Sequence, residues 1–191
     1  MNDNLTERLN VVLEKLISDD LINGRGLGNE IAFYIFDYPP EEELRIRDHI
    51  EFLLKQIPMH MPELRVIHVD LFDMVLDHMR SRNLLEPSYK LQRDKGDEAL
   101  VKALKAPLKE DKLAQVFKEV ARPDDHDLVL VSGIGGVYPM LRSHSLLNNL
   151  HAVMGLKPLV MFFPGRYDGQ SLSLFGELSD NNYYRAFKLV P

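Results

Sequence analysis

Four short apolar runs, each followed by a helical pattern, constrain the fold of this chain more than any other feature. They lie at residues 31–36, 65–70, 127–131 and 159–163. The first run, at residues 31–36, is bounded by turn signals, which is typical of a strand buried on both faces. Strands that alternate with helices are joined by crossovers, which favours a parallel sheet. We therefore expect an α/β fold with a mostly parallel sheet and helices on both faces.

The segments between these runs carry apolar residues at helical spacing. The expected helices cover residues 5–16, 41–57, 71–82 and the stretch that ends near 154, and residues 184–190 are predicted to form an edge strand. Residues 86–122 are interpreted as a helical insert. Because there is no repeat, low-complexity tract or linker, we expect residues 1–191 to form a single domain.

Composition limits what such a domain can do. The net charge of −6 argues against nonspecific binding to nucleic acid, which usually needs a basic face. The chain has no cysteine, so disulfides, thiol nucleophiles and cysteine-ligated zinc are excluded together. No segment approaches the roughly 20 apolar residues that a membrane span needs. We expect a soluble, cytoplasmic protein.

The turn after the first strand decides whether this fold binds a nucleotide. A phosphate-binding loop needs backbone N–H donors and a lysine at that point. Here the turn contains Pro39 and Pro40, followed by three glutamates at positions 41–43. The prolines remove donors and the carboxylates repel phosphate. We therefore expect a core that resembles the P-loop type without its phosphate-binding loop, and we expect no cofactor.

Other motifs give little support to catalysis or metal binding. The sequence Gly133-Ile134-Gly135-Gly136 suits either an anion-binding nest or, as we favour, a tight turn. Asp70, Asp73 and Asp77 align on one predicted helix, which is more typical of a charged helix surface or cap than of a metal site. No HExxH or GxSxG motif occurs. We predict neither a metal site nor a complete catalytic set.

The most distinctive part of the chain is residues 128–191. It contains, in order, an apolar strand with a glycine-rich turn and Tyr138-Pro139, then LRSHSLLNNL, FFPGRYDGQSL, LFG and DNNYYRAF. This order of segments resembles the BrxB family of bacteriophage exclusion (BREX) systems. The resemblance implies a component of a multi-gene phage-defence operon, whose neighbours include the phosphatase-like PglZ, a large ATPase and an adenine methyltransferase. It implies no known catalytic activity.

The same part of the chain supplies the candidate binding residues. In an open parallel sheet, sites form beyond the carboxyl ends of the strands, where segments 133–149 and 163–170 are expected to lie. The candidates for partner or ligand binding are Tyr138, Arg142, His144, Asn148, Asn149, Arg166, Tyr167 and Asp168. Arginine and tyrosine are favoured interface anchors. The alternative is structural, with the asparagines bracing loops and Arg166 paired with a carboxylate.

Three functions remain open at this point. The first is a non-catalytic interaction or scaffold module for other BREX proteins, with PglZ as the preferred partner and the large ATPase as the second. The next is a ligand-sensing or nucleotide-sensing domain, or an enzyme, that uses the carboxyl-end loops. The last is a DNA-binding subunit, for which the lysines and arginines between residues 90 and 112 are the best candidates. Acidic residues lie among them, which favours a solvated surface instead.

Overall fold

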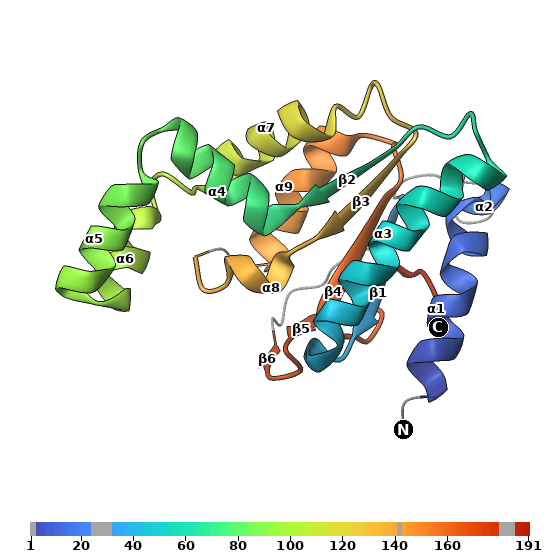
Figure 1. Cartoon of the computed structure of the whole chain (residues 1–191), viewed down its shortest axis with the longest axis horizontal. Coiled ribbons are helices and arrows are strands. Elements are labelled where there is room, and N and C mark those ends of the chain that lie inside the picture. The colour runs from blue at the N-terminus through green and yellow to red at the C-terminus, as the bar shows by residue number, and fades with distance from the viewer. Residues whose placement is uncertain (1–2, 24–31, 141–142, 180–185) are drawn as a thin grey trace.

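A parallel β-sheet forms the centre of the molecule (Figure 1). The computed structural model describes residues 3–23, 32–140, 143–179 and 186–191. The main path of the sheet runs β2-β3-β4-β1-β7, and each of these neighbouring pairs is parallel. The bounds are β1 Phe33–Tyr38, β2 Val66–Asp70, β3 Leu128–Ser132, β4 Leu159–Tyr167 and β7 Phe187–Lys188. The predicted α/β class and single domain are confirmed.

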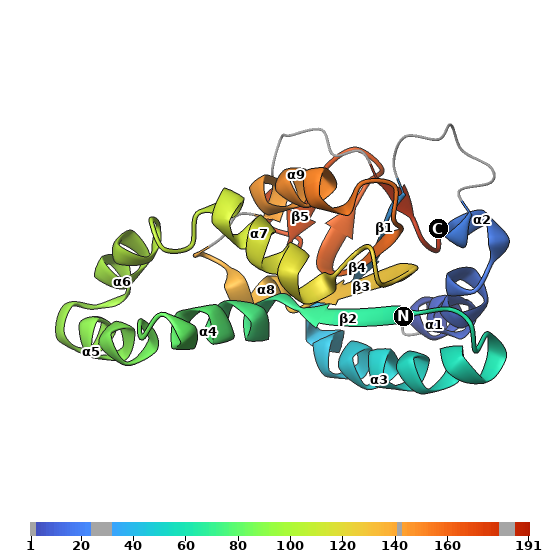
Figure 2. The ribbon, with the colours of Figure 1, turned by 90° about the horizontal axis from the view of Figure 1, so that it is seen from above.

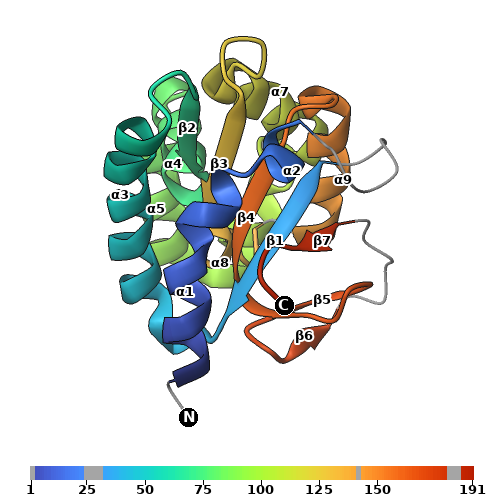
Figure 3. The same cartoon turned by 90° about the vertical axis from the view of Figure 1, so that its right-hand side faces the viewer.

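Helices cover both faces of this sheet (Figure 2). One face carries α1 (Asp3–Leu16) and α3 (Glu43–His60), and the other carries α4 (Leu71–Ser81), α7 (Glu110–Ala121), α8 (Ile134–Val137) and α9 (Ser143–Met154). A short helix, α2 (Asp19–Ile22), follows α1, and a 3-10 turn, η1 (Pro40–Glu42), precedes α3. Figure 3 shows the sheet between these two helical layers.

The alternating side chains of β4 explain why both faces need a cover. Leu159, Met161 and Phe163 enter the core beneath α7 and α9, whereas Val160 and Phe162 enter the core beneath α1 and α3. All of them are buried. Each such side chain contributes roughly 1.5–3 kcal/mol to folding by leaving water. The apolar run of β4 is therefore buried on both faces, and the predicted run at 31–36 overlaps β1, which has side chains in both cores.

The structure extends β4 beyond the predicted strand, which ended before Pro164-Gly165. The strand continues to Tyr167 and pairs antiparallel with β5 (Leu172–Leu174), which in turn pairs with β6 (Leu178–Ser179). Gly165 makes this possible, since its φ is +156° and a side chain there would overlap the carbonyl oxygen of Ser173. At the C-terminus, two residues of the predicted edge strand pair with β1 as β7, and positions 184–185 of that prediction lie outside the described residues.

The predicted helical insert consists of three helices with different surroundings. The first two, α5 (Leu85–Lys95) and α6 (Asp97–Leu104), project away from the sheet (Figures 1 and 2). The third helix, α7, buries Leu113 and Phe117 in the core and packs beside α9. The third part of this segment is therefore an integral layer of the fold.

An ion pair joins the amino-terminal ends of β2 and β3. Arg65 donates to Asp127 from Nη2 to Oδ1 at 2.7 Å and from Nε to Oδ2 at 2.9 Å, and its backbone N–H donates to Oδ2 at 3.1 Å. The hydrogen bonds from the Arg65 side chain are the largest cause that lowers the pKa of Asp127 from 3.8 to about 2. A carboxylate with a depressed pKa stabilises the fold above its unfolded pKa and loses this effect as the pH falls towards its folded pKa.

We predict that Asp127→Asn lowers the melting temperature by about 2–4 °C near neutral pH, as expected for a partly exposed ion pair. The difference from the parent should shrink as the pH falls from about 5 towards 3, where unfolded carboxyl groups take up protons. Thermal melts followed by circular dichroism at several pH values measure this. A deficit that stays constant down to pH 3 would show that the ion pair is not its source.

Candidate functional site

The two loop segments singled out in the sequence meet at the carboxyl edge of the sheet. A side chain added at Gly135 in α8 would lie 3.0 Å from the ring of Phe175 and 3.3 Å from Pro164. Tyr138, at the end of α8, meets Phe175 edge to face, with 6.1 Å between ring centroids. The segment after β3 and the segment after the main part of β4 are therefore neighbours, as their order in the chain predicts.

The glycine-rich turn after β3 is explained by close packing. Gly133 has a φ of +73°, and a side chain there would overlap the carboxylate of Asp70. A side chain at Gly136 would come within 2.9 Å of Phe72. Because α8 lies so close to the start of α4, the turn needs residues without Cβ atoms. This favours the tight-turn interpretation over an anion-binding nest.

We predict that Gly133→Ala lowers the free energy of unfolding by about 2–4 kcal/mol, because it combines a left-handed backbone with a steric clash. Gly155→Ala is the matched control, since Gly155 has a φ of +59° but nothing within 4 Å of an added Cβ. The control should cost only about 1 kcal/mol. Urea unfolding of both variants measures the difference. Equal losses would show that the contact with Asp70 does not matter.

A hydrogen-bonded chain links the carboxyl ends of β2 and β3. Asp70 caps α4 by accepting from the backbone N–H groups of Phe72 at 2.9 Å and Asp73 at 3.1 Å. The Ser132 hydroxyl donates to Asp70 Oδ2 at 3.2 Å, and His68 Nε2 lies 2.8 Å from Ser132 Oγ. Since the only hydroxyl proton of Ser132 goes to Asp70, His68 Nε2 carries the proton in the second bond.

The hydrogen-bonded series His68–Ser132–Asp70 differs from the catalytic triad of a serine hydrolase. There the histidine accepts the serine proton and the carboxylate orients the histidine, whereas here the serine lies in the middle and donates to the carboxylate. Ser132 is buried, and burial is the main cause that lowers the pKa of His68. Asp70 therefore caps α4 and links the ends of β2 and β3. A helix cap is the structural role that the sequence analysis favoured for this residue.

Glu43, just after the turn that follows β1, is hydrogen-bonded to two side chains of the protein itself. Tyr38 donates its hydroxyl to Glu43 Oε2 at 2.5 Å, and Arg47 Nε donates to Glu43 Oε1 at 2.9 Å. Burial, followed by the bond to Glu43, raises the pKa of Tyr38. Pro39 leads directly into η1. The turn after β1 therefore carries a hydrogen-bonded carboxylate in place of free backbone donors and a lysine.

The structure corrects the role of Tyr167 as a surface anchor. Its side chain is only 1% exposed, its hydroxyl donates to the carbonyl of Ala186 at 2.8 Å, and its N–H donates to Asp37 Oδ2 at 3.0 Å. Asp37 also accepts from Arg8 Nη2 at 2.7 Å. Tyr167 therefore belongs to the core, since the ring lies on the inner side of the extended β4. Its neighbour Arg166 is exposed on the opposite side.

The remaining candidates have different surroundings. Asp168 accepts hydrogen bonds from the backbone N–H groups of Ser171 at 2.7 Å and Gln170 at 2.8 Å, and the bonds from Ser171 are the main cause that lowers its pKa to about 2. It shapes the turn between β4 and β5. On α9, Asn148 is exposed and Asn149 is partly buried. Arg142 and the side chain of His144 lie outside the described residues.

We predict opposite outcomes for Arg166 and Tyr167. Tyr167→Ala should lower the free energy of unfolding by about 3–5 kcal/mol through loss of a buried ring. Tyr167→Phe, which removes only the hydroxyl, should cost about 1–2 kcal/mol because the carbonyl of Ala186 loses its donor. Arg166→Ala should change it by no more than about 0.5 kcal/mol. Chemical denaturation of the three variants checks this, and a large loss in Arg166→Ala would contradict it.

Three exposed apolar residues lie at the end of α8 and in the β5–β6 hairpin. Tyr138, Phe175 and Leu178, here called the aromatic patch, are 40%, 38% and 40% exposed. Phe175 lies in the turn between β5 and β6 with a φ of +57°, and Leu178 begins β6. Of the three, only Tyr138 was a sequence-based candidate. The β5–β6 hairpin was not predicted from the sequence. The position of Phe175, the aromatic residue of the LFG sequence, could therefore not be predicted either.

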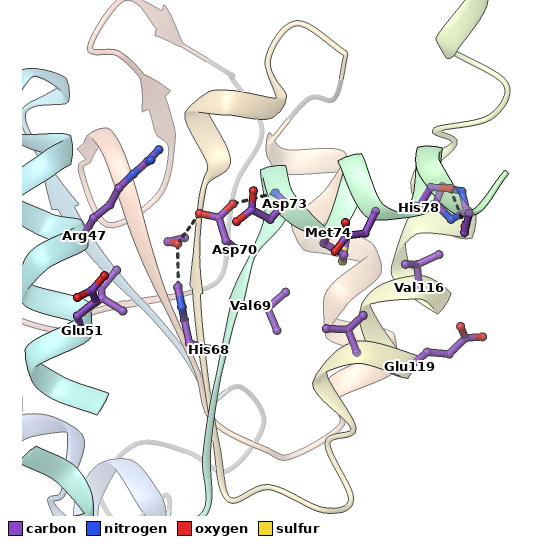
Figure 4. A pocket seen from close by; sticks show the side chains of 15 residues that line it. Arg47, Glu51, His68, Val69, Asp70, Asp73, Met74, His78, Val116 and Glu119 are labelled. Carbon is purple, nitrogen blue, oxygen red and sulfur yellow. Dashed lines mark hydrogen bonds between the residues drawn. The ribbon is translucent and has the colours of Figure 1, made fainter. Parts of the chain in front are cut away.

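A groove lies beside the edge strand β2 and reaches the carboxyl ends of β2 and β3 (Figure 4). This β2 groove has a volume of about 660 Å³ and is lined by residues of α3, β2, α4 and α7 together with Ser132. Asp70, Asp73 and Asp77 all line it. Among the described residues, no group of three or more acidic or histidine side chains is placed to hold a metal ion.

In the part of the chain that the structure describes, no helix is both long enough and apolar enough to cross a membrane.

The fold and its carboxyl edge define a class of protein: a parallel-sheet α/β domain whose first turn is closed by a tyrosine–glutamate–arginine cluster. Comparison with known proteins identifies the family. The family model described as BREX protein BrxB matches residues 67–189. The chain belongs to the BrxB family, and is thus a component of a BREX phage-defence system.

Two relatives match over nearly the whole chain. The BREX protein BrxB of Bacillus cereus (strain H3081.97) is 38% identical over 190 residues, which covers 97% of this chain and 97% of the relative. The BREX protein BrxB of Escherichia coli O9:H4 (strain HS) is 35% identical over 187 residues, covering 98% and 92%. No solved structure matches. The expected resemblance to a P-loop-type core therefore stays a prediction.

Proposed function

We propose that this chain is a non-catalytic interaction module that holds other BREX proteins together. The observation that carries the proposal is the aromatic patch. Two partly exposed aromatic rings, Tyr138 and Phe175, are in edge-to-face contact, and the exposed Leu178 follows Phe175 in the same hairpin. Aromatic side chains on a rigid support are typical centres of protein–protein interfaces.

The support beneath the patch is rigid for physical reasons. Phe175 packs against the place where Gly135 lacks a side chain, and its backbone N–H donates to the carbonyl of Pro164 at 2.9 Å. Leu174, which pairs with Leu178, is buried in the main core. The patch therefore needs little ordering when a partner binds, which lowers the entropic cost of association.

The partner proposed first is PglZ, and the large BREX ATPase is the second choice. Both follow from membership of a system with several protein components, in which a small subunit with an exposed apolar patch is suited to bridging larger ones. A patch of this kind is costly to leave in water unless a partner covers it.

We predict that Tyr138→Ala combined with Leu178→Ala weakens binding to PglZ at least about tenfold, as expected when the apolar centre of an interface is truncated. Leu156→Ala is the matched control, because Leu156 is 77% exposed but lies in the turn before β4, away from the patch. The control should bind like the parent. Co-expression with tagged PglZ, followed by titration with the purified proteins, measures both affinities.

Phage plating separates this proposal from its alternatives. A strain with the double variant should lose protection while the variant keeps its melting temperature and its abundance. Full binding and full protection in the double variant would overturn the proposal. Loss of protection with unchanged affinity for PglZ and for the ATPase would favour a ligand-binding or enzymatic role of the same edge.

A further inference from the structure

The strand β2 has an open backbone edge. It is the last strand of the main path, and in the described part of the chain it pairs with β3 alone. The carbonyl of Arg65 accepts from Leu128 N–H, so in a parallel ladder Ile67 and Val69 also direct their backbone groups towards β3. The alternate residues Val66 and His68 then direct their N–H and C=O groups away from the sheet. An edge of this kind is a template for another strand.

The β2 groove has a wall on each side of this edge (Figure 4). Its walls include Arg47 and Glu51 of α3 on one side, and Val116 and Glu119 of α7 on the other. Five residues of β2 span about 17 Å. The groove contacts the last three residues of β2, His68 to Asp70, and its lining continues along α4 to Ser81, which suits an extended segment better than a compact ligand.

Charge defines what the groove can receive. Glu51, Asp73 and Glu119 are exposed carboxylates along its lining, and Asp77 lies on the same face of α4 as Asp73. Among the described lining residues, Arg47 is the one permanent cation, and its Nε is hydrogen-bonded to Glu43. The rim is therefore negative, and basic side chains would gain from it.

A buried polar atom in the lining has no protein partner. His78 is only 8% exposed, and its Nε2 makes no hydrogen bond within the described residues. Buried polar atoms are usually paired, and an unpaired one needs an explanation. Because Nε2 itself is inaccessible to solvent, a bound segment would pair with it only after the His78 ring turns towards the groove.

We propose that the β2 groove binds an extended, Lys/Arg-containing segment of a partner protein, which adds a strand beside β2. Main-chain hydrogen bonds to Val66 and His68 give affinity, and the acidic rim selects basic side chains. This site is separate from the proposed contact with PglZ, because no residue of the aromatic patch lines the groove. The two surfaces can therefore fail independently.

The first test uses defined peptides and the parent protein. A fluorescent Lys-Val-Lys-Val-Lys-Val-Lys peptide should bind measurably, and its Glu-for-Lys counterpart at least about tenfold more weakly. A Lys-Val peptide with N-methyl groups on alternate amides keeps its charge but cannot pair as a strand, and it should also lose at least about tenfold in affinity. Fluorescence anisotropy at moderate salt gives the three affinities.

Amide hydrogen exchange then locates the bound strand. The Val66 and His68 amides should exchange fast in the free protein and slow down at least about tenfold with the Lys-Val peptide, because they gain partners at the open edge. The Ile67 and Val69 amides should be protected in both states, since they already bond to β3.

Two variants and a control complete the design. The double variant Glu51→Lys with Glu119→Lys should lower the affinity for the Lys-Val peptide at least about tenfold. Glu14→Lys with Glu98→Lys makes the same change of charge at exposed positions outside the groove, and it should have less than about a twofold effect. Val66→Pro removes an outward donor without a bond to β3 and should also weaken binding.

The result that overturns the proposal is binding that depends on charge alone. Equal affinity for the N-methylated peptide, unchanged exchange at Val66 and His68, or equal losses in the two charge variants would each show general electrostatic attraction. Absence of binding to every peptide would also overturn it. Because Val66→Pro can disturb folding, its melting temperature is measured first, and the N-methylated peptide gives the same information with an unaltered protein.

Discussion

The burial of β3 and β4 on both faces is the constraint on which the rest of the structure depends. All five residues of β3 are buried, and so is the apolar run of β4. Two central strands with no wet face need a helical layer on each side, and α1 with α3 and α7 with α9 provide them. Polar chemistry is thereby confined to the strand ends and to the outer edge at β2.

At the strand ends, carboxylates satisfy backbone donors. Asp37, one residue before the end of β1, accepts from the N–H of Tyr167 and from Arg8, and Asp70 ends β2 and caps α4. A buried N–H without a partner would cost about 1–3 kcal/mol, so these acids have clear structural value. The same residues would look like catalytic candidates if only their position were considered. Their hydrogen bonds show that the fold itself uses them.

The sequence predicted the layers well because local patterns determine them. Residues 65–70 and 127–131 carry their own β-strand signal, and the helices between them carry a regular apolar face. Tyr167 could not be placed in the same way. Its burial depends on the hairpin with β5 and on Asp37, which is 130 residues away in the chain. The aromatic patch escaped prediction for the same reason, since Phe175 and Tyr138 meet only through tertiary contacts.

The aromatic patch and the β2 groove differ in the physics of the contacts they offer. The patch is apolar, so its affinity depends on removal of surface from water and weakens little with salt. The groove has an open backbone edge and an acidic lining, and the whole protein has a net charge of −6. Its affinity for a basic segment therefore falls as salt screens the charges. The two surfaces lie on different sides of α8, one at the β5–β6 hairpin and the other along β2. A chain with two unlike surfaces on one rigid sheet can hold two different proteins at a fixed distance. A bridging subunit requires this geometry, and it does not require a catalytic site at the carboxyl edge of the sheet.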